Sequence, residues 1–143
     1  MGPCLPCALS RQAGGDYTAV IEMPDAPAEQ KAQACSNRAW RRFVEGRPRE
    51  AIDDLQHAVS LDPKNVNANA NLAVALLADG QSDAALTAYG TTLAMAHAEN
   101  LAEMTADLEV ALERYGPLPA ADRVRARIET RRKSLECGTG AQA

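Results

Sequence analysis

Apolar residues recur along most of the chain with the three- to four-residue spacing of amphipathic helices. Glycine or proline interrupts this spacing at short intervals, which marks the ends of the helices. Short connections of this kind make neighbouring helices antiparallel. The pattern predicts six helices, over about residues 28–46, 48–61, 66–79, 82–97, 99–115 and 119–136.

Two polar side chains stand where helices are expected to begin. Asp25 can accept hydrogen bonds from the first backbone N–H groups of the first helix, and Pro27 suits its first turn because proline has no N–H to leave unpaired. Ser82 can serve in the same way for the fourth helix. We therefore expect Asp25 and Ser82 to cap these helices.

The ends of the chain lack the helical pattern. The first 25 residues mix glycine, proline and small polar residues. We predict a flexible N-terminal tail over residues 1–25, one helical domain over 26–136 and a flexible C-terminal tail over 137–143.

Composition agrees with an all-α fold. Hydrophobic residues make up 46% of the chain but aromatic residues only 3%, so alanine and leucine supply most of the apolar content. Both are strong helix formers, whereas strands prefer β-branched and aromatic residues.

The chain also repeats itself. A shift of 34 residues aligns the glycines of two predicted inter-helix turns and a set of small or apolar positions around them. The aligned pairs are Asn37 and Asn71, Ala39 and Ala73, Gly46 and Gly80, Ala51 and Ala85, Ile52 and Leu86, Leu55 and Tyr89, Val59 and Leu93, and Leu61 and Met95.

The segment CSNRAWRRFVEGRPREAIDDLQHAVSLDPKN resembles a tetratricopeptide repeat. Its small residues, turn glycine and closing proline stand at the family's positions: Ala39, Gly46, Ala51, Ala58 and Pro63. The next unit, VNANANLAVALLADGQSDAALTAYGTTLAMAHAE, is similar, but Thr92 replaces the second small alanine and His97 replaces the proline. The resemblance covers about residues 32–99.

This resemblance implies a short α-solenoid of antiparallel helix pairs with a C-terminal capping helix. Two repeats are fewer than a stable stack usually needs, so residues 100–136 should supply a third, degenerate pair or cap. The last helix suits a cap. Its apolar face carries Ala121, Val124, Ile128 and Leu135, and its other side carries Arg123, Arg125, Arg127, Arg131, Arg132 and Lys133.

In the family, the first helix of each repeat lines a concave groove. The resemblance therefore implies a partner-binding groove formed by Gln33, Ser36, Asn37, Trp40, Phe43, Val44, Asn67, Asn71, Val74 and Leu77. Trp40 and Phe43 lie one turn apart and suit a semi-exposed hot spot for a peptide; alternatively, both pack against a neighbouring helix or the N-terminal tail. Asn37 and Asn71 can bind a peptide main chain or, alternatively, hydrogen-bond within the repeat.

The sequence does not favour an enzyme. His57 and His97 stand alone on predicted helices, and no catalytic residue, metal ligand set or phosphate-binding loop is recognisable. Cys4 and Cys7 form a CxxC pair without the further ligands or the strand–helix setting of a zinc or redox site. We predict no cofactor, no metal and no catalytic role.

Charge narrows the range of partners. The net charge of −4 gives no overall footprint for nucleic acid, and the basic face of the last helix is expected to be solvated. No apolar run is long enough to span a membrane. We expect a cytoplasmic protein; the alternative is an exported or lipid-anchored one, through Cys4 or Cys7, if the chain's true start lies upstream.

The sequence therefore predicts a scaffold that binds a peptide or partner protein in its concave groove. The alternative is a structural or assembly subunit that forms a homo-oligomer or docks through an open stack end near residues 92–112.

Overall fold

The computed structural model describes residue 19 and residues 21–142. Cys4, Cys7 and most of the predicted N-terminal tail lie outside these residues. The regular structure of the described residues is all helical, as predicted. Its helices are α2 (Ala28–Val44), α3 (Pro48–Leu61), α4 (Val66–Ala78), α5 (Ser82–Met95), α6 (Ala98–Tyr115) and α7 (Ala121–Gln142).

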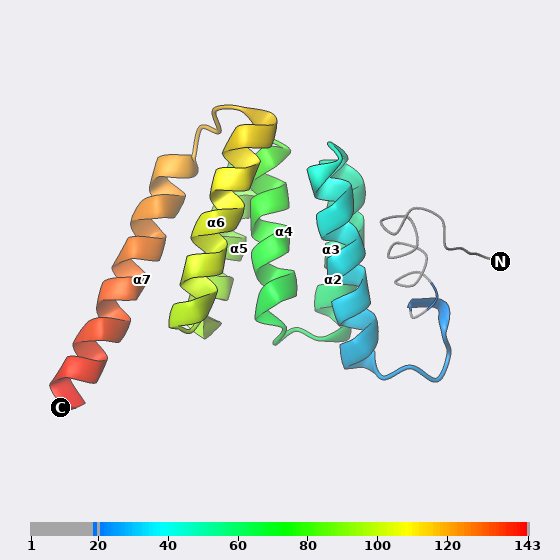
Figure 1. Ribbon diagram of the computed structural model, residues 1–143, viewed down its shortest axis with the longest axis horizontal. Coiled ribbons are helices and arrows are strands. Elements are labelled where there is room, and N and C mark those ends of the chain that lie inside the picture. Colours follow the sequence, from blue (N-terminus) through cyan, green and yellow to red (C-terminus); the bar gives the residue numbers. More distant parts are fainter. Residues whose placement is uncertain (1–18, 20, 143) are drawn as a thin grey trace.

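The helices pack as antiparallel pairs in a short stack (Figure 1). The pairs are α2 with α3, α4 with α5, and α6 with α7. α4 contacts α2, α3, α5 and α6, so it is the central helix of the stack. α2 and α6 also touch each other, which brings the first helix of every pair into mutual contact. The predicted solenoid of helix pairs is therefore confirmed.

The two aligned glycines make the same turn. Gly46 and Gly80 have positive φ angles of 93° and 89°, a backbone conformation that residues with a Cβ atom rarely adopt. In the first turn, Gly46 N–H donates to Phe43 and Arg47 N–H donates to Arg42. The same two bonds recur around Gly80. Both helices thus end in a Schellman motif, which explains why glycine occurs at this position in both repeats.

The predicted caps are wrong. Pro27 is the residue before α2 and Gln81 the residue before α5, and neither helix start has a side-chain cap. Asp25 lies too far ahead of α2, and Ser82 is already inside α5, beyond the capping position. α4 has the side-chain cap that sequence reasoning missed: Asn65 Oδ1 accepts a hydrogen bond of 3.0 Å from Ala68 N–H.

The last helix is longer than predicted. We expected it to end near Glu136, ahead of the glycine at position 138, but α7 runs to Gln142. Glycine disfavours a helix by only about 1 kcal/mol and, unlike proline, does not force it to stop.

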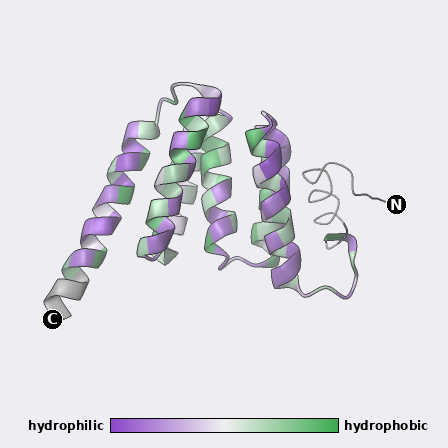
Figure 2. Cartoon of the chain, in the orientation of Figure 1, coloured by the Kyte–Doolittle hydropathy of each residue, from purple (hydrophilic) through white to green (hydrophobic). Residues whose placement is uncertain are grey.

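Alanine allows the helices to cross closely. The repeated small residues are all fully buried: Ala39, Ala51, Ala58, Ala73 and Ala85. Cys35 is buried as well. Most of α4 is apolar, as Figure 2 shows, because it has protein on several sides.

The second repeat is not an opening in the stack. Thr92, which replaces an alanine, is fully buried, and its hydroxyl donates to the carbonyl of Ala88 at 2.8 Å within its own helix. His97 precedes α6, where its N–H donates to Asn100 Oδ1 at 2.8 Å. The two departures from the repeat pattern are therefore accommodated locally.

α7 covers this end of the stack. Val124 and Ile128 are buried in the same core cluster as Leu101 and Leu108 of α6. Arg127 donates to the carbonyl of Leu86 on α5 at 2.9 Å. The expected capping helix is present, and it covers the stack end whose opening was the basis of the assembly alternative.

Candidate functional site

The ten predicted groove residues divide by exposure. Gln33, Val44 and Asn67 are exposed, and Asn37 and Trp40 are half-buried. The others are buried: Ser36, Phe43, Asn71, Val74 and Leu77. The prediction of a common groove face therefore divides into a surface part and a buried part.

Phe43 is not the semi-exposed residue that we expected. It is 1% exposed, and its ring lies 5.1 Å from that of Trp40 in a stacked arrangement. On its other side lies Tyr115 of α6, with ring centroids also 5.1 Å apart. Phe43 is a core residue that links α2 to α6, so only Trp40 of the pair reaches the surface.

Val74 and Leu77 are buried for a different reason. They belong to α4, which is enclosed by its neighbours, so a helix face that would be open in a longer and flatter stack is covered here. Neither residue can contact a partner directly.

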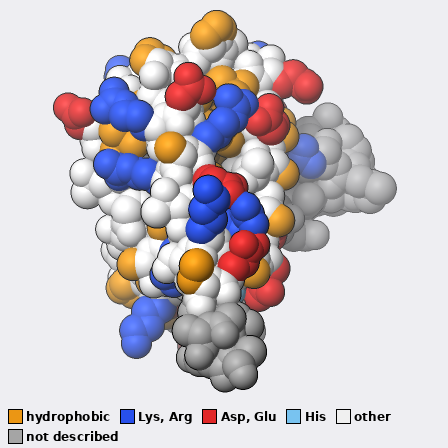
Figure 3. All heavy atoms as spheres, turned by 90° about the vertical axis from the view of Figure 1, so that its left-hand side faces the viewer, with side chains coloured by type: hydrophobic (Ala, Val, Ile, Leu, Met, Phe, Trp, Pro, Cys, Tyr) orange, Lys and Arg blue, Asp and Glu red, His pale blue; other side chains and the backbone are white. Residues whose placement is uncertain are grey.

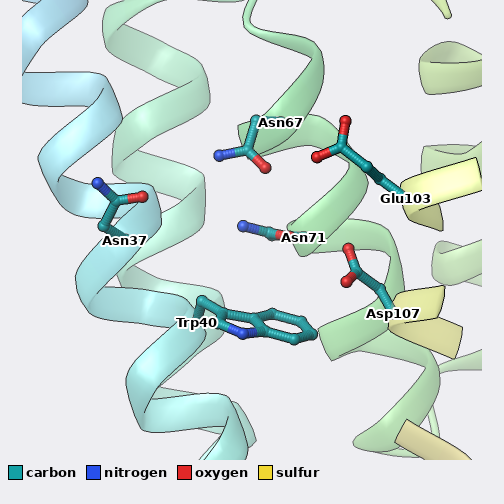
Figure 4. A pocket seen from close by; sticks show the side chains of 6 residues that line it. All are labelled: Asn37, Trp40, Asn67, Asn71, Glu103 and Asp107. Atoms are coloured by element: carbon teal, nitrogen blue, oxygen red, sulfur yellow. The ribbon is translucent and has the colours of Figure 1, made fainter. Parts of the chain in front are cut away.

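A hollow remains where the first helices of the three pairs meet. Its volume is about 230 Å³. Figure 4 shows the side chains that line it, two from each helix: Asn37 and Trp40 of α2, Asn67 and Asn71 of α4, and Glu103 and Asp107 of α6. Four of the ten predicted residues thus come together at one site.

Amide side chains organise the α2–α4 side of the hollow. Asn71 Nδ2 donates to Ser36 Oγ at 2.9 Å, and Asn67 Nδ2 donates to the same oxygen at 3.3 Å. Asn37 Oδ1 accepts from Gln33 Nε2 at 3.0 Å. Asn37 therefore bonds within its own repeat, whereas Asn67 and Asn71 bond across to the preceding repeat, and these bonds fix the direction in which each amide points.

Two carboxylates form the α6 side. Glu103 and Asp107 are four residues apart, so they lie on the same face of the helix. Burial, together with the nearby charge of Glu103, raises the pKa of Asp107 to about 6. Neither carboxylate forms an ion pair with residues 19 or 21–142. This side of the hollow is acidic and uncompensated.

Sequence reasoning missed both carboxylates because the repeat was not extended into the third pair, where the shift from the second pair is 36 residues and not 34. Gly116 also has a positive φ, 82°, and ends α6 as Gly80 follows α4. If Gly116 is aligned with Gly80, Glu103 corresponds to Asn67 and Asp107 to Asn71. The turn glycine was therefore the signal that could have located them.

Beyond the hollow, side chains of α6 hydrogen-bond to the end of α2. Arg114 Nε donates to the carbonyl of Val44 at 2.9 Å and its Nη2 donates to that of Glu45 at 3.2 Å. The hydroxyl of Tyr115 donates to the carbonyl of Phe43. These bonds satisfy the carbonyls of Val44 and Glu45 at the C-terminus of α2 and give that of Phe43 a second donor besides Gly46 N–H.

The basic face of α7 differs from the hollow in that two of its arginines form ion pairs with acidic side chains and two others donate to backbone carbonyls. Figure 3 looks onto this end of the stack and shows acidic side chains among the arginines. Arg125 pairs with Glu109 at 2.7 Å, and Arg132 pairs with Glu129 and Glu136. Arg131 donates to the carbonyl of Ala96 at 3.4 Å. Arg125, Arg127 and Arg131 thus help to attach α7 to the rest of the stack.

Neither a metal-binding cluster nor a membrane-spanning helix is found in the described part of the chain. Residues 19 and 21–142 contain no cluster of three or more histidine, cysteine, aspartate or glutamate side chains that could hold a metal ion. Among the same residues, no helix combines the length and apolar character required to cross a bilayer.

Comparison with known protein families gives a match to the tetratricopeptide repeat over residues 43–108. This part of the chain belongs to the tetratricopeptide repeat family. The match runs from the end of α2 through α3, α4 and α5 into α6, and so includes both Schellman turns. Neither the curated proteins nor the solved structures gave a match. Tetratricopeptide repeats imply protein–protein interaction in general.

Proposed function

We propose that the hollow between α2, α4 and α6 is the centre of a groove that binds an extended segment of a partner protein. The observation that supports this most is the convergence of polar side chains from all three pairs on one hollow. The core cluster of this fold is apolar, mostly alanine and leucine, so polar side chains gathered at a concavity point to a role outside the core.

The exposed edge of Trp40 adds to this proposal. Trp40 is the single tryptophan of the chain and is half-buried beside the hollow. Its ring is held by stacking on Phe43, so a partner would meet a rigid aromatic surface. Rigid aromatic anchors bury large area with little loss of conformational entropy, and they dominate many interfaces.

The assembly alternative has less support. It relied on an open stack end near residues 92–112, where Thr92, Leu101, Met104 and Leu108 are in fact buried. Residues 92–112 expose no large hydrophobic side chain, and α7 packs against α5 and α6, the helices of this segment.

A displayed random-octapeptide library, selected on the full chain, tests groove binding while the partner is still unidentified. Selected peptides are then titrated against Asn67→Tyr, which fills the hollow from its exposed rim. Gln56→Tyr, at an exposed position of α3, is the matched control. We expect about a tenfold loss of affinity for Asn67→Tyr only, which corresponds to 1.4 kcal/mol.

The indole N–H of Trp40 gives a second measure, since a protein with one tryptophan shows one indole signal in its ¹⁵N–¹H NMR spectrum. Bound peptides should move that signal. Peptides that bind both tyrosine variants equally and leave the indole signal in place would contradict binding in this groove.

A further inference from the structure

The hollow presents hydrogen-bond acceptors that have no donors. Asn71 is only 5% exposed and lines the hollow, and its amide nitrogen is already committed to Ser36. Its carbonyl oxygen therefore points away from Ser36, and among the described residues no donor bonds to it. This oxygen is not fully enclosed, so an N–H or O–H donor that enters the hollow can reach it and complete its hydrogen bonding.

The carboxylates of Glu103 and Asp107 are further acceptors in the hollow for which the described residues supply no cationic partner. Figure 4 shows them projecting from α6 toward Asn67 and Asn71. Asp107 is partly buried, and this loss of hydration disfavours its charged form and raises its pKa. Such a group is unfavourable for the fold, and ionisable groups of this type cluster at functional sites.

Close to Asp107 lies another unsatisfied group. The hydroxyl of Tyr89, on α5, is buried and forms no hydrogen bond with the described residues. The charge of Asp107 helps to raise the pKa of Tyr89, which shows that the two groups are within electrostatic reach. With Tyr89 neutral, only the two acids carry charge here, and both are negative.

The remaining wall suits a cation as well. In Figure 4 the indole of Trp40 extends from α2 across the hollow toward α6. Tryptophan is the aromatic side chain that attracts ammonium and guanidinium groups most strongly. A hollow of about 230 Å³ has room for several water molecules of about 30 Å³ each, and so for the end of one long side chain.

Resting on the proposed groove function, we propose that the hollow receives a lysine or arginine side chain of the bound partner segment. Its N–H groups would donate to Glu103, Asp107 and the carbonyl of Asn71, while its positive charge would compensate the two acids. A neutral or acidic side chain would leave the carboxylates without compensation, so the hollow selects a basic segment.

The test uses four synthetic peptides that differ at one position. Each is an N-acetylated, C-amidated heptapeptide of alanine and serine with lysine, arginine, glutamine or glutamate at its centre. The indole signal of Trp40 in the full chain reports binding. We expect saturable shifts with lysine and arginine, about tenfold weaker binding with glutamine and none with glutamate, as expected for charge-assisted hydrogen bonds.

Two variants locate the effect. The double variant Glu103→Gln/Asp107→Asn should remove the preference for lysine over glutamine. Glu113→Gln removes one negative charge from the same helix but lies outside the hollow, so it should keep the preference within about twofold. A preference that survives in the double variant would overturn the proposal.

The outcomes separate this inference from the groove function. If glutamine binds as tightly as lysine, or the selected octapeptides bind at Trp40 without any basic residue, the groove function stands and the cation inference is wrong. If no peptide in either experiment moves the indole signal, both are wrong.

Discussion

Two buried or half-buried aspartates in this small domain have opposite surroundings. Asp54, on α3, is 7% exposed and is held by two arginines of α2: Arg38 through two bonds of 3.0 and 2.7 Å, and Arg42 through one of 2.9 Å. Asp107, on α6, faces a second carboxylate and no arginine of the described chain. The first arrangement joins two helices, whereas the second joins none.

The difference shows how a structural acid can be told from one available for binding. Structural acids in a partly buried setting have their acceptors filled by the same chain, because an uncompensated charge there is unfavourable. Asp107 violates that rule beside a hollow, next to the half-exposed Trp40. The contrast between Asp54 and Asp107 can be tested by stability measurements in which the two residues should respond with opposite sign.

Asp54→Asn should have the largest effect. It leaves the guanidinium groups of Arg38 and Arg42 without their counter-charge in a site where their side chains are only 20% and 27% exposed. We expect the free energy of unfolding, measured with urea, to fall by about 2–3 kcal/mol. Asp53→Asn, at the exposed neighbouring position, should stay within about 0.5 kcal/mol of the wild type. If Asp53→Asn lowered the free energy of unfolding as much as Asp54→Asn, the two arginine pairs of Asp54 would not be the cause of its effect.

Asp107→Asn should act in the opposite direction. The pKa of Asp107 is raised in the folded state to about 6, so the folded protein binds more protons than the unfolded chain between about pH 4 and 6. The charged form therefore destabilises the fold above this window. We expect the variant to be more stable than the wild type at pH 7 by about 1–2 kcal/mol, reduced from the full linkage value because the group is only half-buried.

The pH dependence provides the check. Glu103 on the same helix is the other titrating group beside Asp107, and Tyr89 stays neutral over this range, as do Trp40, Asn67 and Asn71. As the pH falls toward 4, wild-type Asp107 becomes protonated and the difference between the two proteins should vanish. A stability difference that is constant from pH 4 to 7 would show that charge is not its cause.

Asn67→Lys should change the free energy of unfolding least of the three variants. It would give the carboxylates of the hollow a cationic partner on a neighbouring helix, as Asp54 has in Arg38 and Arg42. Figure 4 shows Asn67 across from Glu103, where an ammonium group could pair with the α6 carboxylates. We expect about 0.5 kcal/mol of stabilisation at pH 7 and a lower pKa of Asp107, followed by NMR of its carboxyl carbon. Gln56→Lys on α3 is the control. If the pKa of Asp107 does not move, the two sides of the hollow are too far apart for one cation to bridge.

Sequence alone predicted the scaffold well because the features that define it are local. The glycines at 46 and 80 must adopt positive φ, and the small residues at the helix crossings must be small, so both leave a repeating trace in the sequence. The helix starts were predicted less well. Proline at the first turn and a polar residue nearby are compatible with several starting positions, and those predicted at Asp25 and Ser82 are wrong.

The candidate site was predicted only in part because it depends on contacts between helices distant in the sequence. In the sequence, Phe43 and Trp40 are both aromatic residues on one helix face, and nothing local shows which is exposed. Tyr115, 72 residues further along the chain, contacts Phe43 and helps to bury it. The acidic side of the hollow belongs to a third pair whose resemblance to the repeat is weak. Its residues could be placed only by the turn glycine Gly116.

The bonds from Arg114 and Tyr115 to the end of α2 have a consequence for how the domain unfolds. In a simple solenoid each repeat contacts its immediate neighbours only, so terminal repeats can open one at a time. Here the first and third pairs hold each other directly, across about 70 residues of chain. Opening either end disrupts the other, so the stack should lose its structure in one cooperative step and not by fraying inward from its termini.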